Sequence, residues 1–176
     1  MRLFLCEVLH LATSLVVFGL VTRVSPVNDS WVLAGALLGG FLIDVDHIFD
    51  QLIVFGLDLS PVKLFKGGSF LYGDKAYIFF HGWEYVFLLL IAYWLLIITG
   101  APLVWSTFIL TLCLSMFGHL VIDSNTNHMS YTGYSLIYRL KHNFNLEKLV
   151  TPQHWQKHLE DQKSLKVLGW QAKHSL

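Results

Sequence analysis

The stretch GFLIDVDHIFD, residues 40–50, decides how the rest of the chain has to be arranged. It lies inside an apolar run that extends from Trp31 to Phe55. One charged side chain at the centre of a membrane-spanning helix costs about 2.5–3.5 kcal/mol on insertion. Because this run carries several ionisable groups, we expect a metal ion, a polar partner or a water-filled cavity to receive them. The groups are Asp44, Asp46, His47 and Asp50.

The composition indicates an integral membrane protein. Of the 176 residues, 55% are hydrophobic and only 14% are charged, and the mean hydropathy is +0.55. A soluble domain of this length carries more charge. The formal net charge is zero, so nothing in the composition argues for a nucleic-acid partner, which would call for a basic stripe. Cys6 and Cys113 both lie in apolar segments and are expected to be small buried hydrophobic residues rather than a disulfide.

Four segments are close to the 20 or so residues that cross a bilayer. We therefore predict an all-α fold, an integral membrane bundle of four transmembrane helices over residues 1–128. Residues 129–176 are expected to form an amphipathic, interfacial and cytosolic helical tail of the same domain. The four predicted helices are roughly Leu3–Val21, Trp31–Phe55, Ala76–Ile98 and Leu103–Ile122.

The distribution of lysine and arginine predicts the orientation. Three lysines lie between the second and third predicted helices, Arg139 and six lysines follow the fourth, and the short connection Thr99–Pro102 has no charge. Positive residues collect on the cytoplasmic side. Both termini are therefore expected in the cytoplasm, with the protein in the cytoplasmic (inner) membrane. The loop 65–73, which contains two glycines, is a candidate gate.

With this orientation, every predicted helix delivers ionisable groups to the same depth near the cytoplasmic face. Spacings of three or four residues place the members of each pair on one helix face. Imidazole and carboxylate together are typical ligands of zinc, and also of manganese or iron. The candidate ligands are His10 on the first helix, Asp44 and His47 on the second, His81 and Glu84 on the third, and His119 and Asp123 on the fourth.

The number of candidates exceeds the three protein ligands of one open catalytic zinc site, so one or two divalent transition metals are expected. Asp46 points away from Asp44 on a helix and is a candidate general base or bridging ligand. Asp50 lies on the same helix face as Asp46, so one of the two is expected to act as a base or to support the metal ligands rather than to bind metal itself.

The order of these residues resembles the membrane-bound metal-dependent hydrolase family of bacteria and archaea. LIDVDH (42–47) is similar to that family's PDIDH-type signature, His81-Gly82 to the start of its His-Arg-Gly-x-Thr-His box, and GHLVIDSNT (118–126) to its His-x-x-x-Asp-x-x-Thr ending. The resemblance covers about the first 126 residues. It implies functional roles for His10, Asp44, Asp46, His47, His81, His119, Asp123 and Thr126.

The chain departs from the family pattern in two places. Ile43 replaces the proline of the signature, and HGWEY (81–85) lacks the arginine and the second histidine of the box, so Glu84 is expected as the substitute ligand. The spacing of His119 and Asp123 is also similar to a pair in zinc-dependent phospholipase C. By analogy, this implies a lipid or phosphodiester substrate.

The polar segment after the fourth helix supplies candidate substrate contacts. Thr126 lies at the end of the ligand-bearing motif, and YTGYSLIYRLKHNFN (131–145) mixes aromatic residues with Arg139 and Lys141. Arg139 is expected either to hold a phosphate group with two hydrogen bonds or to anchor the chain at the membrane surface. His154 and His158, four residues apart in the tail, are expected on a solvated helix face.

The expected function is that of a membrane-embedded metal-dependent hydrolase. Metal-activated water would attack a lipid ester or phosphodiester at the cytoplasmic leaflet, with membrane lipid as substrate or surroundings. The alternative is a non-catalytic membrane protein that binds metal, transports ions or binds lipid. A transport path would need polar groups in both halves of the membrane. The outer halves of the predicted helices carry few of them.

Overall fold

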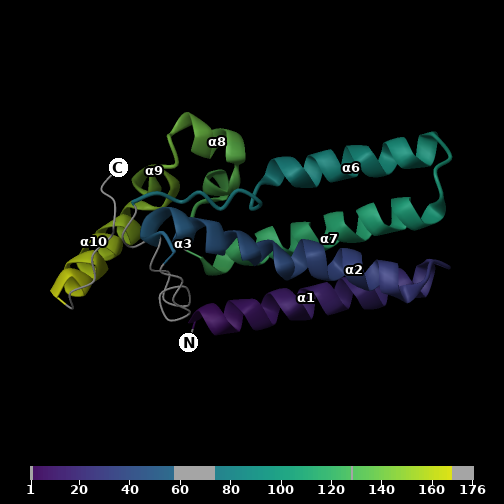
Figure 1. The fold of residues 1–176 in the computed structure, drawn as a ribbon, viewed down its shortest axis with the longest axis horizontal. Coiled ribbons are helices and arrows are strands. Elements are labelled where there is room, and N and C mark those ends of the chain that lie inside the picture. The colour runs from purple at the N-terminus through teal and green to yellow at the C-terminus, as the bar shows by residue number, and fades with distance from the viewer. Residues whose placement is uncertain (1, 58–73, 128, 168–176) are drawn as a thin grey trace. The chain divides into compact units, whose positions relative to one another are not determined.

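The computed structural model describes residues 2–57, 74–127 and 129–167, and within these ranges the fold is built from helices without a β-strand (Figure 1). The loop 65–73, predicted as a gate, lies outside the described residues. Contacts divide the chain into two compact units. The first unit contains residues 1–44 and 80–126, and the second contains residues 45–79 and 127–176. The division into a membrane bundle over residues 1–128 and a tail of the same domain over residues 129–176 stays a prediction.

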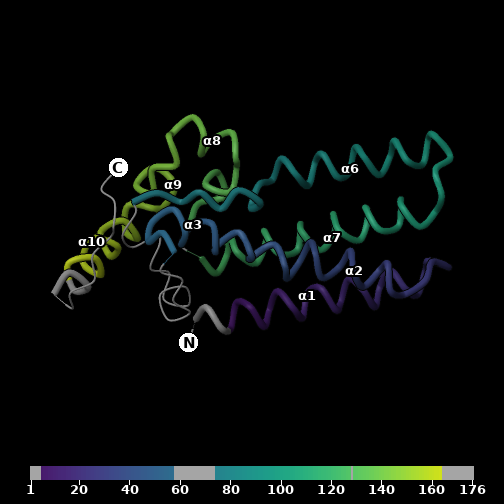
Figure 2. Tube along the Cα trace, in the orientation of Figure 1, coloured from purple at the N-terminus to yellow at the C-terminus, as the bar shows by residue number. Residues whose placement is uncertain are grey.

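The first unit is a bundle of four helices, which lie lengthwise beside one another (Figure 1). Helix α7 packs against all three of the others. Figure 2 shows how the short connection at 99–102 turns the chain from α6 back along α7. The helices are α1 (Arg2–Val24), α2 (Asp29–Gly40), α6 (Trp83–Ile98) and α7 (Leu103–Thr126).

Glycines bring α2 close to the backbone of α7. A Cβ atom on Gly35 would lie 2.9 Å from the carbonyl oxygen of Phe108, and one on Gly39 would overlap the carbonyl oxygen of Leu112. Small residues at helix interfaces are the main device by which helices pack in membranes, where hydrophobic burial supplies little driving force. The glycines thus fix how near these two helices lie.

Two described helices are long and apolar enough to cross a membrane, at Leu5–Val24 and Leu103–Thr126. A third span arises if Asp29–Gly40 and Leu42–Phe55 count as one broken helix. The prediction of four spans is therefore met only in part. The shortfall lies at Ala76–Ile98, where the helix begins only at Trp83 and has 16 residues. The amide of Ala76 donates instead to the carbonyl oxygen of Phe144, at 3.0 Å, which holds this part of the chain outside a helix.

The second unit consists of short helices around a small apolar core. Ala76, Leu146 and Leu149 are buried together, and Trp155 packs against them. Isolated bridges join Lys75 to Asn145 and Met129 to Val150. The helices are α3 (His47–Phe55), η2 (Tyr131–Tyr134), α8 (Leu136–Lys141), α9 (Leu146–Leu149) and α10 (Pro152–Val167).

Candidate metal centre

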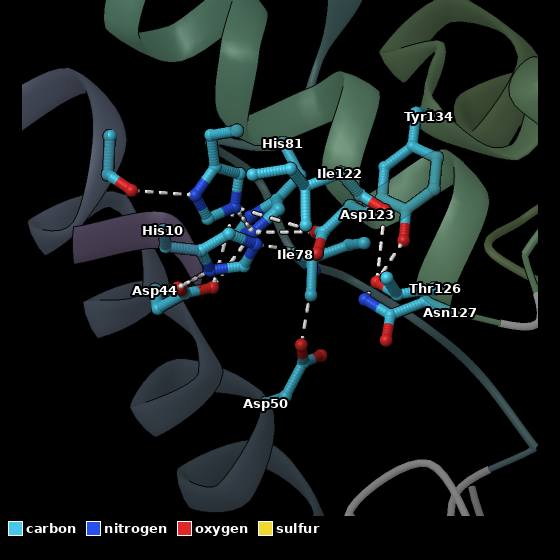
Figure 3. A network of polar contacts seen from close by, with 12 residues as sticks. His10, Asp44, Asp50, Ile78, His81, Ile122, Asp123, Thr126, Asn127 and Tyr134 are labelled. Carbon is cyan, nitrogen blue, oxygen red and sulfur yellow. Dashed lines mark hydrogen bonds and ion pairs between the residues drawn. The ribbon is translucent and has the colours of Figure 1, made fainter. Parts of the chain in front are cut away.

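Five of the predicted ligands meet inside the first unit, although they come from four separate parts of the chain (Figure 3). One comes from the middle of α1, and one from the 3₁₀ helix η1 (Leu42–Asp46) that follows α2. A third precedes α6, and two come from the last two turns of α7. We call these residues the metal cluster: His10, Asp44, His81, His119 and Asp123.

Four atoms of the metal cluster, two imidazole nitrogens and two carboxylate oxygens, lie close to one another. The Nε2 atom of His81 lies 3.1 Å from Oδ1 of Asp44 and 3.6 Å from Oδ2 of Asp123. The Nε2 atom of His119 lies 3.6 Å and 3.4 Å from the same two oxygens. The two Nε2 atoms are 3.0 Å apart. These five distances therefore fall between 3.0 and 3.6 Å.

These distances match the edges of a coordination polyhedron. Ligand atoms at about 2.0–2.1 Å from a zinc ion in tetrahedral geometry are about 3.3 Å from one another. Two imidazole nitrogens and two carboxylate oxygens form a ligand set that zinc, manganese and iron accept. The first unit thus holds a set of donor atoms with the chemistry and the spacing of a metal site.

A backbone carbonyl orients His119. Its Nδ1 atom lies 2.9 Å from the carbonyl oxygen of Gly40 in α2. A carbonyl oxygen only accepts hydrogen bonds, so Nδ1 carries the proton and donates it. The lone pair of a neutral His119 then lies on Nε2, which faces the cluster. Hydrogen bonds of this kind behind a metal-binding histidine fix the ring and its tautomer.

His10 joins the two carboxylates from the other side. Its Nδ1 atom lies 3.0 Å from Oδ2 of Asp44, and its Nε2 atom lies 3.1 Å from Oδ1 of Asp123. Each carboxylate therefore contacts His10 with one oxygen and faces His81 and His119 with the other. This arrangement places His10 in the cluster and holds both carboxylates in position.

The metal cluster is almost closed to solvent. The side chains of His10, His81, His119 and Asp123 are at most 3% exposed, whereas that of Asp44 is 12% exposed. Two buried carboxylates are costly unless positive charge compensates them. A divalent cation would balance both charges, and Asp44 is the member of the cluster nearest to solvent.

Glu84, the expected substitute ligand, lies in the first turn of α6 and falls outside the ligand groups found among the described residues. The expectation that His81 and Glu84 share one helix face is wrong. Helix α6 begins at Trp83 with Gly82 as its N-cap, so His81 precedes the helix. The amide of Gly82 donates to the carbonyl oxygen of Phe80, at 3.1 Å, and this tight turn presents His81.

The remaining residues of the opening motif belong to the second unit. Asp46 is fully buried and ends η1, and the half-buried His47 begins α3. Asp50 accepts hydrogen bonds from the amides of Tyr77 and Ile78, at 2.9 and 3.1 Å, so its carboxylate holds an extended part of the chain. The roles of Asp46 as base and of His47 as ligand stay predictions.

The two predicted substrate contacts bond to the protein itself in this structure. The hydroxyl of Thr126 donates to the carbonyl oxygen of Ile122, at 2.9 Å. Arg139 is fully buried in the second unit, and its Nη1 atom donates to the carbonyl oxygens of Ile78, at 2.6 Å, and Tyr77, at 3.4 Å. Substrate binding by either residue stays a prediction.

Sequence reasoning missed two features. The first is the carbonyl oxygen of Gly40, for which the glycines at 35, 39 and 40 were the available signal, since they mark a close helix contact. The second is His158, which was expected on a solvated face. It is only 8% exposed, and its Nε2 atom lies 3.0 Å from Oδ1 of Asp74. No local pattern signals this contact, because 84 residues separate the partners.

Comparison with known proteins adds no relative from which a role could be transferred. No protein-family model, curated protein or solved structure matches the chain.

Proposed function

We propose that the protein is an integral membrane metalloprotein that binds a divalent transition metal, zinc foremost, through His81, His119, Asp44 and Asp123. The observation that supports this proposal is the set of donor-atom distances of 3.0–3.6 Å. The proton on Nδ1 of His119 adds a second argument, because it directs the other ring nitrogen toward the cluster.

The proposed activity is hydrolysis of a lipid ester or phosphodiester at the cytoplasmic leaflet. A bound divalent ion supplies an activated water and polarises the oxygen under attack. Within the cluster, His10 holds the carboxylates in place, and Asp44 lies where solvent has some access. Asp46, two residues after Asp44, is proposed as the general base. The support for this activity is the ordered resemblance of the motifs to membrane-bound metal-dependent hydrolases.

The proposed topology has four membrane helices with both termini in the cytoplasm of the inner membrane. The lysine distribution supports the orientation. For the fourth span, the support is α6, which is apolar after Glu84 in its first turn and packs along α7. Its 16 residues extend about 24 Å at 1.5 Å per residue, somewhat less than the hydrocarbon core.

A non-catalytic metal-binding protein is the second candidate. Four protein ligands fill a tetrahedral zinc site, and catalytic zinc sites usually keep one position open. The burial of four cluster members at 3% exposure or less favours such a closed site. Hydrolysis requires a fifth ligand position, or the displacement of one carboxylate.

The test uses the full chain in lipid nanodiscs, with metal content measured by elemental analysis and turnover measured on labelled phospholipids. The unsubstituted protein is expected to hold metal at a fixed ratio, Asp123→Asn to lose it, and Glu84→Gln to retain it as the matched control. Absence of bound metal from the unsubstituted protein would overturn the metal site. If the unsubstituted protein binds metal but turns over lipid no faster than Asp44→Asn, the proposed hydrolase activity is wrong. Non-catalytic metal binding, the second candidate, then remains.

A further inference from the structure

Helix α8 buries its arginine and exposes two large aliphatic side chains, the reverse of what is usual for a helix on a water-exposed surface. Arg139 is fully buried, whereas Ile137 is 67% exposed and Leu140 is 58% exposed. Soluble proteins almost never bury arginine without partners and normally cover their large aliphatic side chains. The surroundings on each side of the helix have to explain both the buried arginine and the exposed aliphatic side chains.

The inner side explains the arginine. Its guanidinium donates to the carbonyl oxygens of Tyr77 and Ile78, in the same extended segment whose amides bind Asp50. Carboxylate and guanidinium thus hold this segment through its N–H groups and its carbonyl groups. Charge-assisted hydrogen bonds of this kind offset the cost of burying the charge. On the inner side of α8, Arg139 therefore makes polar contacts and Tyr138 packs against the small apolar core, while Ile137 and Leu140 are left on the outside.

The outer side carries Ile137, Leu140 and Lys141. Spacings of three and four residues from Ile137 place the other two on its helix face. Removing one such aliphatic side chain from water stabilises a protein by about 1.5–3 kcal/mol, so exposure of two to water forgoes a sizeable gain. Tyr131 of the neighbouring η2 is also exposed, at 57%. Apolar side chains beside tyrosine and lysine are typical of segments at a membrane surface.

The chain keeps this face within reach of the bilayer. Helix α7, one of the candidate spans, ends at Thr126, and η2 begins at Tyr131. Only five residue steps along the chain separate the end of this candidate span from the start of η2. A lysine at such a surface gains about 1 kcal/mol from anionic lipid.

We propose that the outer face of α8, formed by Ile137, Leu140 and Lys141, inserts into the headgroup region of a bilayer that contains anionic lipid. Ile137 and Leu140 lie at the boundary with the acyl chains, and Lys141 contacts lipid phosphate. This contact holds the second unit to the membrane through its own surface, in addition to the chain connections. It does not depend on metal binding.

The test is a depth measurement on the full chain in vesicles of phosphatidylcholine and phosphatidylglycerol. Cys6 and Cys113 are replaced by alanine, and single variants Ile137→Cys, Leu140→Cys and Glu147→Cys are labelled with a fluorophore. Glu147 is exposed in α9 of the same unit and serves as the control. Brominated lipid is expected to quench the labels at 137 and 140 severalfold more than the label at 147, and aqueous iodide to show the reverse order. In pure phosphatidylcholine, the quenching at 137 should fall.

Two results would overturn the proposal. Equal iodide quenching at all three positions would show that the face of α8 lies in water. Protection from both quenchers at 137 and 140 would show that protein covers the face, for example a second copy of the chain. Each variant is first compared with the unsubstituted protein by size-exclusion elution, and Lys141→Cys replaces a variant that elutes differently.

Discussion

The Nδ1 atom of His119 donates a hydrogen bond to the carbonyl oxygen of Gly40, at 2.9 Å, so the backbone of α2 orients a candidate metal ligand on α7. The orientation of this ring therefore depends on how closely the two helices pack. The close packing depends in turn on Gly35 and Gly39 of α2, because a side chain at either position would meet the backbone of α7.

Gly39→Ala is expected to lower both metal affinity and stability. Its Cβ atom would overlap the carbonyl oxygen of Leu112, which is backbone and has no rotamer to change, so the helices must separate. Loss of support behind a metal ligand typically costs 10–100-fold in affinity. Metal titration and thermal unfolding in detergent measure the two effects. Gly19→Ala is the control, because nothing lies within 4 Å of its added Cβ atom; similar losses in both variants would contradict the prediction.

Removal of metal by a chelator is expected to destabilise the protein. An ion that binds only the folded state stabilises it by about 2.7 kcal/mol when its concentration is a hundred times the Kd. The two carboxylates of the cluster would also lose their compensating charge. Thermal unfolding with and without chelator, followed by addition of zinc, checks this. Asp123→Asn should show no response to either treatment, and a chelator effect of equal size in that variant would argue against the cluster as its origin.

His10→Ala and His81→Ala are expected to differ in kind. The two ring nitrogens of His10 contact Oδ2 of Asp44 and Oδ1 of Asp123, which are not among the proposed donor atoms. The Nε2 atom of His81, in contrast, is one of those donor atoms. Loss of His10 should weaken metal binding by about 10–100-fold, as for other groups behind the ligands, without abolishing it. Loss of His81 should remove stoichiometric binding. Competition with a chelator of known affinity separates the two cases, and retention of full affinity by His81→Ala would disprove this assignment.

Asp50→Asn is expected to loosen the segment at Tyr77 and Ile78. The carboxylate accepts both amides, whereas an asparagine side chain has one acceptor oxygen and turns an NH₂ group toward the second amide. Loss of one hydrogen bond to a charged group costs about 1.5–3 kcal/mol. Hydrogen exchange at these two amides should accelerate, while Glu147→Gln leaves it unchanged. Unaltered exchange in Asp50→Asn would show that other contacts hold the segment.

Much of the proximity within the metal cluster could be predicted from the sequence, because an α-helix rises by a fixed distance per residue and residue number therefore gives position along the helix. His10, His119 and Asp123 lie on regular helices, and counting residues from the ends of those helices brings them to one level. Asp44 also lies beside the histidines, as the sequence predicts, although it is on a 3₁₀ helix rather than an α-helix.

The rest depended on contacts that no local pattern specifies. The approach to His81 is extended because its backbone bonds to residues more than 60 positions away, such as Phe144 and Arg139. Hydrophobicity alone had extended the third helix back to Ala76. Arg139 shows the same limit, since its charge predicts either a phosphate contact or an anchor at the membrane surface, and no local pattern signals its hydrogen bond to the carbonyl oxygen of Ile78.

The cluster draws on residues 10, 44, 81, 119 and 123, and none of the four contributing segments holds more than two of them. In chain order, His10 and Asp44 come first and His119 and Asp123 come last, so the cluster is complete only when α1 and α7 lie together. Under the proposed function, metal loading therefore follows assembly of the bundle. Metal would then bind only to chains in which α1 and α7 are already packed together. Bound metal would thus distinguish an assembled bundle from a chain that is inserted but not yet assembled.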